Sequence, residues 1–176
     1  HVNNKLISSA AFIKQKQFNI LPSFTATYKQ MTINYSRDVN LPGFTSLNPV
    51  RDISNPYFVF KGNPDLLSSI RDNISLNLFF NDPKRFLSVS GWMSAAFTQQ
   101  DVVNSILLNS AGVQESTPVN ANGSRNYSMN WNINKQYKNK QNIIVMWNTG
   151  NWMGVNKSRL FFNGTSSWQT TFNDSH

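Results

Sequence analysis

Charged residues are absent from eight long segments of this chain, and this absence constrains the fold more than any other feature. No Asp, Glu, Lys or Arg occurs in Leu6–Ile13, Phe18–Tyr28, Gln30–Ser36, Asn73–Asn81, Phe86–Gln100, Asn126–Asn134, Gln141–Asn156 or Leu160–Asn173. Most of these segments are about as long as the roughly 9–11 residues that a tilted strand needs to cross a bilayer. A soluble sheet normally carries charges on its solvated face, so the pattern favours strands in a membrane.

Within these segments apolar and polar residues alternate with period two, as they do along strands. In a membrane barrel the apolar face contacts lipid and the polar face lines the lumen. We therefore expect one set of residues to contact lipid, including Leu76, Leu78, Met129, Trp131 and Ile133. The intervening set is neutral and polar and is expected to face the lumen, including Asn77, Asn130 and Asn132.

Asparagine is the commonest residue of the chain, although it is normally depleted from strands. A wet lumen accounts for this bias, because an Asn amide can hydrogen-bond there to water and to its neighbours. The main alternative is a soluble β-sandwich whose polar face binds carbohydrate.

The sequence offers little for catalysis. It contains no Cys, and His1 and His176 are its only histidines, so the commonest general bases and metal ligands are missing from the body of the chain. The eight carboxylates fall in or beside predicted turns, at no spacing that indicates a shared acid/base site. We predict no catalytic residue, no metal site and no cofactor, which disfavours a secreted hydrolase or any other enzyme.

The net charge of +8 raises nucleic acid as a partner, because a basic face can neutralise phosphates. Lys and Arg are instead scattered at segment ends, without aromatic residues interleaved along one element. We therefore expect no nucleic-acid partner.

Short and long connections alternate along the predicted strands. The short links are Lys29–Gln30, Asp82–Arg85 and Gln136–Lys140, and the longer ones are Val39–Arg71, Asp101–Gly123 and a segment around Trp152–Gly164. Outer-membrane barrels place tight turns on the periplasmic side and longer loops outside the cell. The predicted fold is all-β, with antiparallel up-and-down strands, roughly eight of them, forming part of a transmembrane β-barrel.

The first long connection carries a series of short motifs. They are Tyr35-Ser36-Arg37, Pro42, Leu47-Asn48-Pro49, Asn55-Pro56 and Gly62-Asn63-Pro64-Asp65-Leu66. This succession resembles the C-terminal barrel region of TonB-dependent outer-membrane receptors, particularly the outer-membrane β-barrel family of Bacteroidetes-type bacteria. Beyond about Asn81 the resemblance rests on the rhythm of strands and loops.

The resemblance implies a bacterial outer-membrane location and uptake of a scarce nutrient, such as a glycan, a siderophore or a peptide. Residues 1–176 would then be one partial barrel domain, an internal piece of a longer chain without its signal peptide and plug domain. The implied partners are membrane lipid and lipopolysaccharide, the remaining strands and plug of the receptor, a TonB-type energising protein that acts through absent regions, and a small nutrient ligand.

We predict that the connection from Asn40 to Leu66 lies outside the cell, contains little regular strand and takes part in ligand capture. Its prolines restrict their own backbone and that of the preceding residues, so the segment is stiff and loses less entropy on binding. Its cations can meet anionic groups, while its aromatic side chains either stack on ligand rings or pack within the loop. The candidate ligand-binding residues are Arg51, Tyr57, Lys61 and Asn63.

Overall fold

The computed structural model of the protein describes residues 19–138, 140, 141 and 143–175. The elements in chain order are β1 (Ser23–Tyr28), β2 (Met31–Asn40), α1 (Phe44–Leu47), β3 (Arg51–Asn55), β4 (Phe58–Lys61), β5 (Ser69–Asp82), β6 (Leu87–Gln99), β7 (Asp101–Leu108), β8 (Gln114–Ala121), β9 (Ser124–Lys138), β10 (Ile144–Phe162) and β11 (Thr165–Ser175). The all-β prediction is confirmed, with α1 as a single short helix. No helix in this described part is long and apolar enough to cross a membrane.

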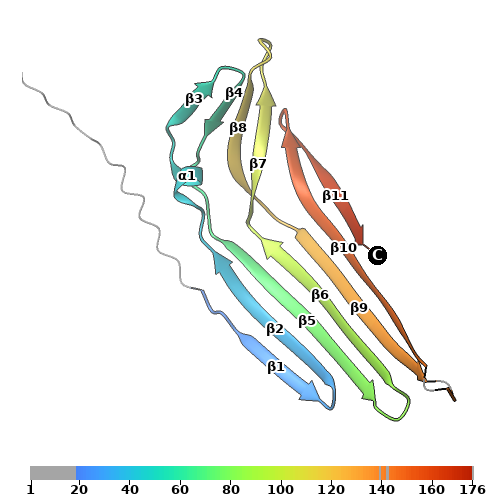
Figure 1. Ribbon diagram of the computed structural model, residues 1–176. Helices are drawn as coiled ribbons and strands as arrows, with labels where there is room; N and C mark the ends of the chain where they lie inside the picture. Colours follow the sequence, from blue (N-terminus) through green and yellow to red (C-terminus); the bar gives the residue numbers. More distant parts are fainter. Residues whose placement is uncertain (1–18, 139, 142, 176) are drawn as a thin grey trace, which may run out of the picture.

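The long strands form one antiparallel sheet, which we call the main sheet. It contains β1, β2, β5, β6, β9, β10 and β11 in that spatial order (Figure 1). Among the described residues β1 pairs only with β2, and β11 pairs only with β10. The sheet is therefore open at both edges.

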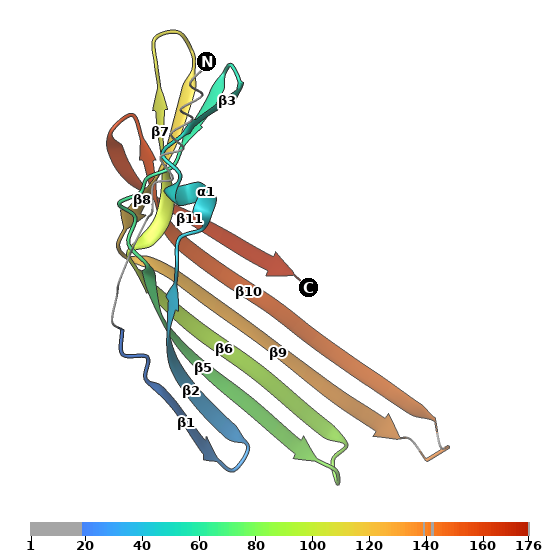
Figure 2. The same ribbon diagram turned by 90° about the vertical axis from the view of Figure 1, so that its left-hand side faces the viewer.

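Three of the short connections lie at one end of the main sheet, the lower end in Figures 1 and 2. They join β1 to β2, β5 to β6, and β9 to β10. The connections from β2 to β5 and from β6 to β9 run through the opposite end. The predicted segregation of short and long connections is confirmed for these five connections, whereas the short turn between β10 and β11 lies at the upper end.

The long connections fold into an upper extension made of α1, β3, β4, β7 and β8. Two hairpins, β3–β4 and β7–β8, are joined by parallel pairing of β4 with β8. Parallel pairing of β7 with the end of β10, at Ser105↔Phe161 and Ile106↔Phe162, attaches the extension to the main sheet. These two short parallel contacts are a feature that an up-and-down barrel pattern does not predict.

The prediction of little regular strand between Asn40 and Leu66 is wrong, because this segment contains α1, β3 and β4. Its prolines lie at positions where no backbone N–H has to donate a hydrogen bond to a neighbouring strand. Pro56 lies in the turn between β3 and β4, and Pro49 precedes β3. Proline is excluded from central strand positions rather than from the turns beside them.

The prediction of a longer connection around Trp152–Gly164 is also wrong, because β10 continues to Phe162 and a two-residue turn follows. Asn163 and Gly164 have φ angles of 47° and 77°, as a type I′ hairpin turn requires. The strand persists because β11 pairs with it from Trp152 to Phe162. The main sheet and the upper extension together form a sheet of 11 strands, more than the roughly eight predicted. The predicted strand segment Leu6–Ile13 lies outside the described residues.

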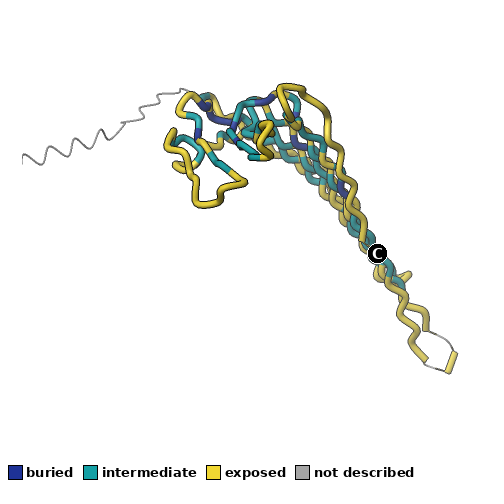
Figure 3. The backbone as a smooth tube through the Cα atoms, turned by 90° about the horizontal axis from the view of Figure 1, so that it is seen from above, coloured by how far each residue is buried: buried dark blue, intermediate teal, exposed yellow. Residues whose placement is uncertain are grey.

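Very little of the described chain is buried, and Figure 3 shows exposed and intermediate residues along nearly all of it. The buried hydrophobic residues are Leu66, Ala96 and Ala121. The accessible surface is 13216 Å², whereas size scaling gives roughly 8,700 Å² for a compact monomer of this mass. A β-sandwich requires two sheets packed face to face, and the described strands form a single layer (Figures 1–3). The β-sandwich alternative is therefore wrong.

Candidate functional site

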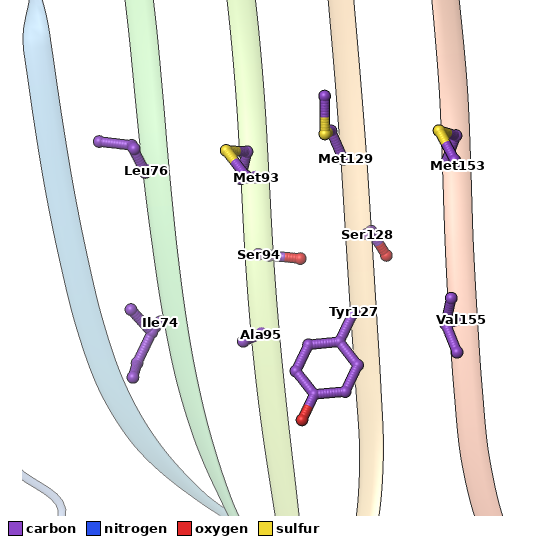
Figure 4. Close-up of a pocket in the computed structure, with 10 residues that line it drawn as sticks. All are labelled: Ile74, Leu76, Met93, Ser94, Ala95, Tyr127, Ser128, Met129, Met153 and Val155. Atoms are coloured by element: carbon purple, nitrogen blue, oxygen red, sulfur yellow. The ribbon is translucent and has the colours of Figure 1, made fainter.

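The register of the main sheet gathers apolar residues into rows across one face. Figure 4 shows the parts of two neighbouring rows on β5, β6, β9 and β10, where they line a shallow groove of about 450 Å³. The first row is Ile33, Leu76, Met93, Met129 and Met153, and the second is Tyr35, Ile74, Ala95, Tyr127 and Val155. Because alternate residues of a strand share a face, Leu78, Trp131 and Ile133 lie on this face as well. The predicted apolar set thus shares one face.

Charged residues mark both borders of these rows. Asp72 and Asp82 are ten positions apart on β5. Arg125 lies in the same row as Asp72, and Lys135 lies in the same row as Asp82, so these two residues are also ten positions apart on β9. Ten residues span roughly 34 Å along a strand, or roughly 26 Å across a membrane at a typical tilt of about 40°. Outer-membrane barrels have an apolar band about 25 Å tall. We call the rows between these borders the apolar belt; Asp174, in the row of Met153, is a charged exception.

The opposite face of the main sheet is lined by amides and hydroxyls that bond to one another. Thr25 Oγ1 donates to Asn34 Oδ1 at 3.0 Å, and Asn134 Nδ2 donates to Asn132 Oδ1 at 2.7 Å. At Gly150 a Cβ atom would lie 2.8 Å from Asn132 Nδ2, so this amide occupies the space beside the glycine. The predicted lumen residues, Asn77, Asn130 and Asn132, lie on this polar face.

Two tryptophans stand among the amides of the polar face. One row across the sheet consists of Thr32, Asn77, Trp92, Asn130 and Trp152. The two indoles flank Asn130 on adjacent strands, and a groove of about 460 Å³ beside Trp92 is also lined by Phe79 and Ser90. We call Thr32, Asn77, Phe79, Trp92, Asn130 and Trp152 the lumen patch.

The lumen patch combines stacking surfaces with neutral hydrogen-bonding groups. Trp152 lies flat along its own strand, because a Cβ at Gly154 would meet its Cη2 at 2.8 Å. Aromatic faces provide large apolar contact area, while Asn and Thr side chains both donate and accept hydrogen bonds. This chemistry suits an uncharged ligand with hydroxyl groups and flat apolar faces. Sequence reasoning missed the patch, because only the register of β6, β9 and β10 brings the two tryptophans together.

The hairpin β3–β4 carries three of the four predicted ligand-binding residues. Arg51 and Lys61 are register partners across the hairpin. Arg51 Nη2 lies 2.5 Å from Glu115 Oε2, so its charge is partly neutralised by β8. Tyr57 is in the hairpin turn and is 73% exposed. The structure therefore brings Arg51 and Lys61 together and leaves Tyr57 at the tip.

Asn63, the fourth predicted residue, lies at the base of the upper extension. Its Nδ2 donates to the carbonyl of Pro118 at 3.2 Å, and its Oδ1 accepts from the backbone N–H of Asp65 at 3.0 Å. Both ends of its amide are thus used inside the protein. Leu66 and Pro118 are fully buried beside this position, so Asn63 helps to hold the extension together.

The described residues outside the membrane include one carboxylate with a shifted pKa. The hydroxyl and the backbone N–H of Ser54 donate to Asp52 Oδ1 at 2.6 Å and 3.0 Å. These hydrogen bonds, the hydroxyl contributing most, hold the pKa of Asp52 below its ordinary value of 3.8. No His, Cys, Asp or Glu cluster within the described part is arranged to hold a metal ion.

Comparison with known proteins agrees with this geometry. The sequence profile of the outer membrane protein beta-barrel family matches residues 1–175. Neither curated proteins nor solved structures give a significant match. The belt of membrane thickness, the polar opposite face and the segregated connections are the features such a family requires. The chain therefore belongs to the outer membrane protein beta-barrel family and is located in the bacterial outer membrane.

Proposed function

We propose that the chain forms part of the wall of an outer-membrane receptor that takes up a scarce nutrient with energy from a TonB-type protein. The lumen patch supports this proposal most directly, because it places Trp92 and Trp152 among uncharged amides on the polar face. Such a surface binds a ligand without holding it through charge. The motifs between Tyr35 and Leu66, which resemble those of TonB-dependent receptors, also support it.

A role in binding and transport fits this arrangement better than catalysis. Among the ligand classes that such receptors take up, a glycan suits the lumen patch best, since sugar rings stack on indoles and sugar hydroxyls bond to amides. A siderophore or a peptide is the alternative. The open edges of β1 and β11 require further strands, because an unpaired strand edge in lipid leaves backbone groups unsatisfied. We assign those strands, and a plug, to the rest of the receptor.

The test of this function is uptake of labelled oligosaccharide by cells, with and without the TonB-type protein. Trp92→Ala is expected to lower the initial uptake rate, because it removes a stacking surface from the lumen. Trp131→Ala is the matched control, since Trp131 lies on the adjacent strand but on the apolar face. Equal uptake by both variants and wild type, or uptake independent of the TonB-type protein, would contradict the proposal.

We further propose that the upper extension is extracellular and that the short turns at the lower end of the main sheet are periplasmic. The chain has no Cys, so a single cysteine introduced into it labels one defined position of this chain. Ser54→Cys in β3 is expected to react with an impermeant thiol reagent on intact cells. Asp82→Cys, at the border of the β5–β6 turn, should react only after the outer membrane is opened. The reverse labelling pattern would show that the topology is the opposite one. It would contradict a role of Arg51, Tyr57 and Lys61 in ligand capture.

A further inference from the structure

Three cations gather on the membrane-facing side of the main sheet, at the upper border of the apolar belt. Lys157 on β10 is the register partner of Arg125 on β9, and Arg159 is the register partner of Trp168 on β11. By strand alternation these side chains project from the face that carries the belt. The first apolar row below them contains Tyr127, Val155 and Phe172.

The ring of Trp168 contacts two of these cations, Lys157 and Arg159. The Lys157 Nζ lies 4.8 Å from the centroid of its ring, and the Arg159 Cζ lies 4.5 Å from the same centroid. The far edge of the ring reaches Gly123, where a Cβ would lie 2.9 Å from Trp168 Cη2. The ring therefore extends across the end of β10 and holds both cations through cation–π contact.

Among the described residues, no carboxylate forms an ion pair with the cations of this group. Elsewhere in the sheet a carboxylate binds Arg37, which donates to Asp72 at 2.7 and 3.0 Å. Within residues 19–138, 140, 141 and 143–175, no carboxylate pairs with Arg125, Lys157 or Arg159. Arg159 donates instead to the Ser166 hydroxyl at 3.2 Å. Neighbouring cations without counterions form a site for an anion.

We propose that Arg125, Lys157, Arg159 and Trp168, which we call the border cluster, bind the phosphate groups of an outer-leaflet lipid. The apolar belt determines how deeply this lipid lies in the membrane. Its acyl chains cover the apolar rows, and its phosphates then lie at the level of the cations directly above these rows. Tryptophan is typical of this level of a membrane. The inference rests on the proposed function only for the orientation that places the upper end in the outer leaflet.

The test uses the protein purified from outer membranes in mild detergent and titrated with diphosphorylated lipid A. Combined Arg125→Gln, Lys157→Gln and Arg159→Gln is expected to weaken binding on the order of a hundredfold, because each cation near an anionic lipid contributes about fivefold. Lys29→Gln, Lys84→Gln and Lys138→Gln together are the matched control. They remove the same charge at the opposite end of the sheet and should leave binding unchanged.

Two further arms identify the ligand and guard against misfolding. Dephosphorylated lipid A should bind poorly to the wild type, and millimolar inorganic phosphate should not displace the diphosphorylated lipid. Combined Arg125→Lys and Arg159→Lys keeps the charge and should retain binding. The proposal is overturned if the glutamine triple variant binds normally while folded, if the control triple variant loses binding equally, or if free phosphate competes.

This assay is independent of transport. Wild-type protein that binds the lipid through the border cluster but supports no nutrient uptake would contradict the proposed function and leave the lipid site intact. Conversely, the wild type could take up the nutrient while the glutamine triple variant binds the lipid as well as the wild type does. That result would overturn the lipid site alone.

Discussion

In the main sheet the large apolar side chains remain exposed, whereas the upper extension meets the sheet at a buried and hydrogen-bonded junction. Met93, Met129 and Met153 are 45%, 36% and 50% exposed in one row of the belt, while Leu66 at the junction is 0% exposed. The main sheet thus depends on lipid to cover its apolar face, whereas the junction is covered by the protein itself. Substitutions in the two regions should therefore fail in different ways.

The largest expected effect is a charge placed in the apolar belt. Leu78→Arg should destabilise the folded protein in a bilayer by about 2–4 kcal/mol, the cost of Arg near the membrane midplane. Asn130→Arg, on the polar face, should cost much less, since the side chain stays in water. Urea unfolding of each variant in lipid vesicles measures both values. Equal costs at the two positions would mean that the faces are assigned wrongly.

Next in size is an added methyl group in the extension. At Gly62 a Cβ would lie 2.3 Å from the Asn48 carbonyl oxygen, so Gly62→Ala should destabilise the extension by about 1–3 kcal/mol through overpacking. Hydrogen exchange should rise in α1 and β4 and stay unchanged in the main sheet. Gly43→Ala is the control, because nothing lies within 4 Å of its added Cβ. Faster exchange throughout the main sheet would show that the two regions are not independent.

A smaller effect is expected at Asn120, whose amide joins three backbone groups at the junction. Its Oδ1 accepts from Leu67 N–H at 2.8 Å, and its Nδ2 donates to the carbonyls of Leu67 and Gln100 at 2.9 and 2.8 Å. Asn120→Ala should cost about 0.5–1.5 kcal/mol, because water replaces much of what is lost. Asn104→Ala on β7 is the comparison, and a cost as large there would refute a special role for Asn120.

The smallest effect is a pH dependence confined to the hairpin β3–β4. The pKa of Asp52 is lowered by Ser54, so its contribution is complete above the ordinary value of 3.8 and is lost as pH falls through the lowered pKa. Protection of the Ser54 amide should therefore fall in acid, while the main sheet shows no such transition. Asp52→Asn should abolish the pH dependence, and its persistence in that variant would assign the transition to another group.

The faces of β5 and β9 could be predicted from sequence because alternation is a local property of each strand. Leu76 and Asn77 lie on opposite faces whichever strands pair with β5. The sequence pattern does not predict the strand around Trp152–Gly164, a segment that includes Lys157 and Arg159. They lie on a strand that has passed beyond the belt, where charge is tolerated.

The candidate sites were less predictable, because they depend on register and on distant contacts. Asn63 was expected to meet a ligand, yet its amide binds Pro118, 55 residues away in the chain. Trp92 and Trp152 flank Asn130 only because β9 lies between β6 and β10. No local pattern in the sequence specifies either arrangement.

The most direct test of the lipid-facing belt is a cysteine scan of residues 74–80 in the cysteine-free chain, with a spin label at each position in lipid vesicles. Collisions with oxygen, which concentrates in lipid, should be most frequent at residues 74, 76, 78 and 80. Collisions with a water-soluble nickel complex should be most frequent at 75, 77 and 79, where the side chains face a wet lumen. Accessibilities that rise and fall together, without a period of two, would contradict a main sheet with one face in lipid and the other in water.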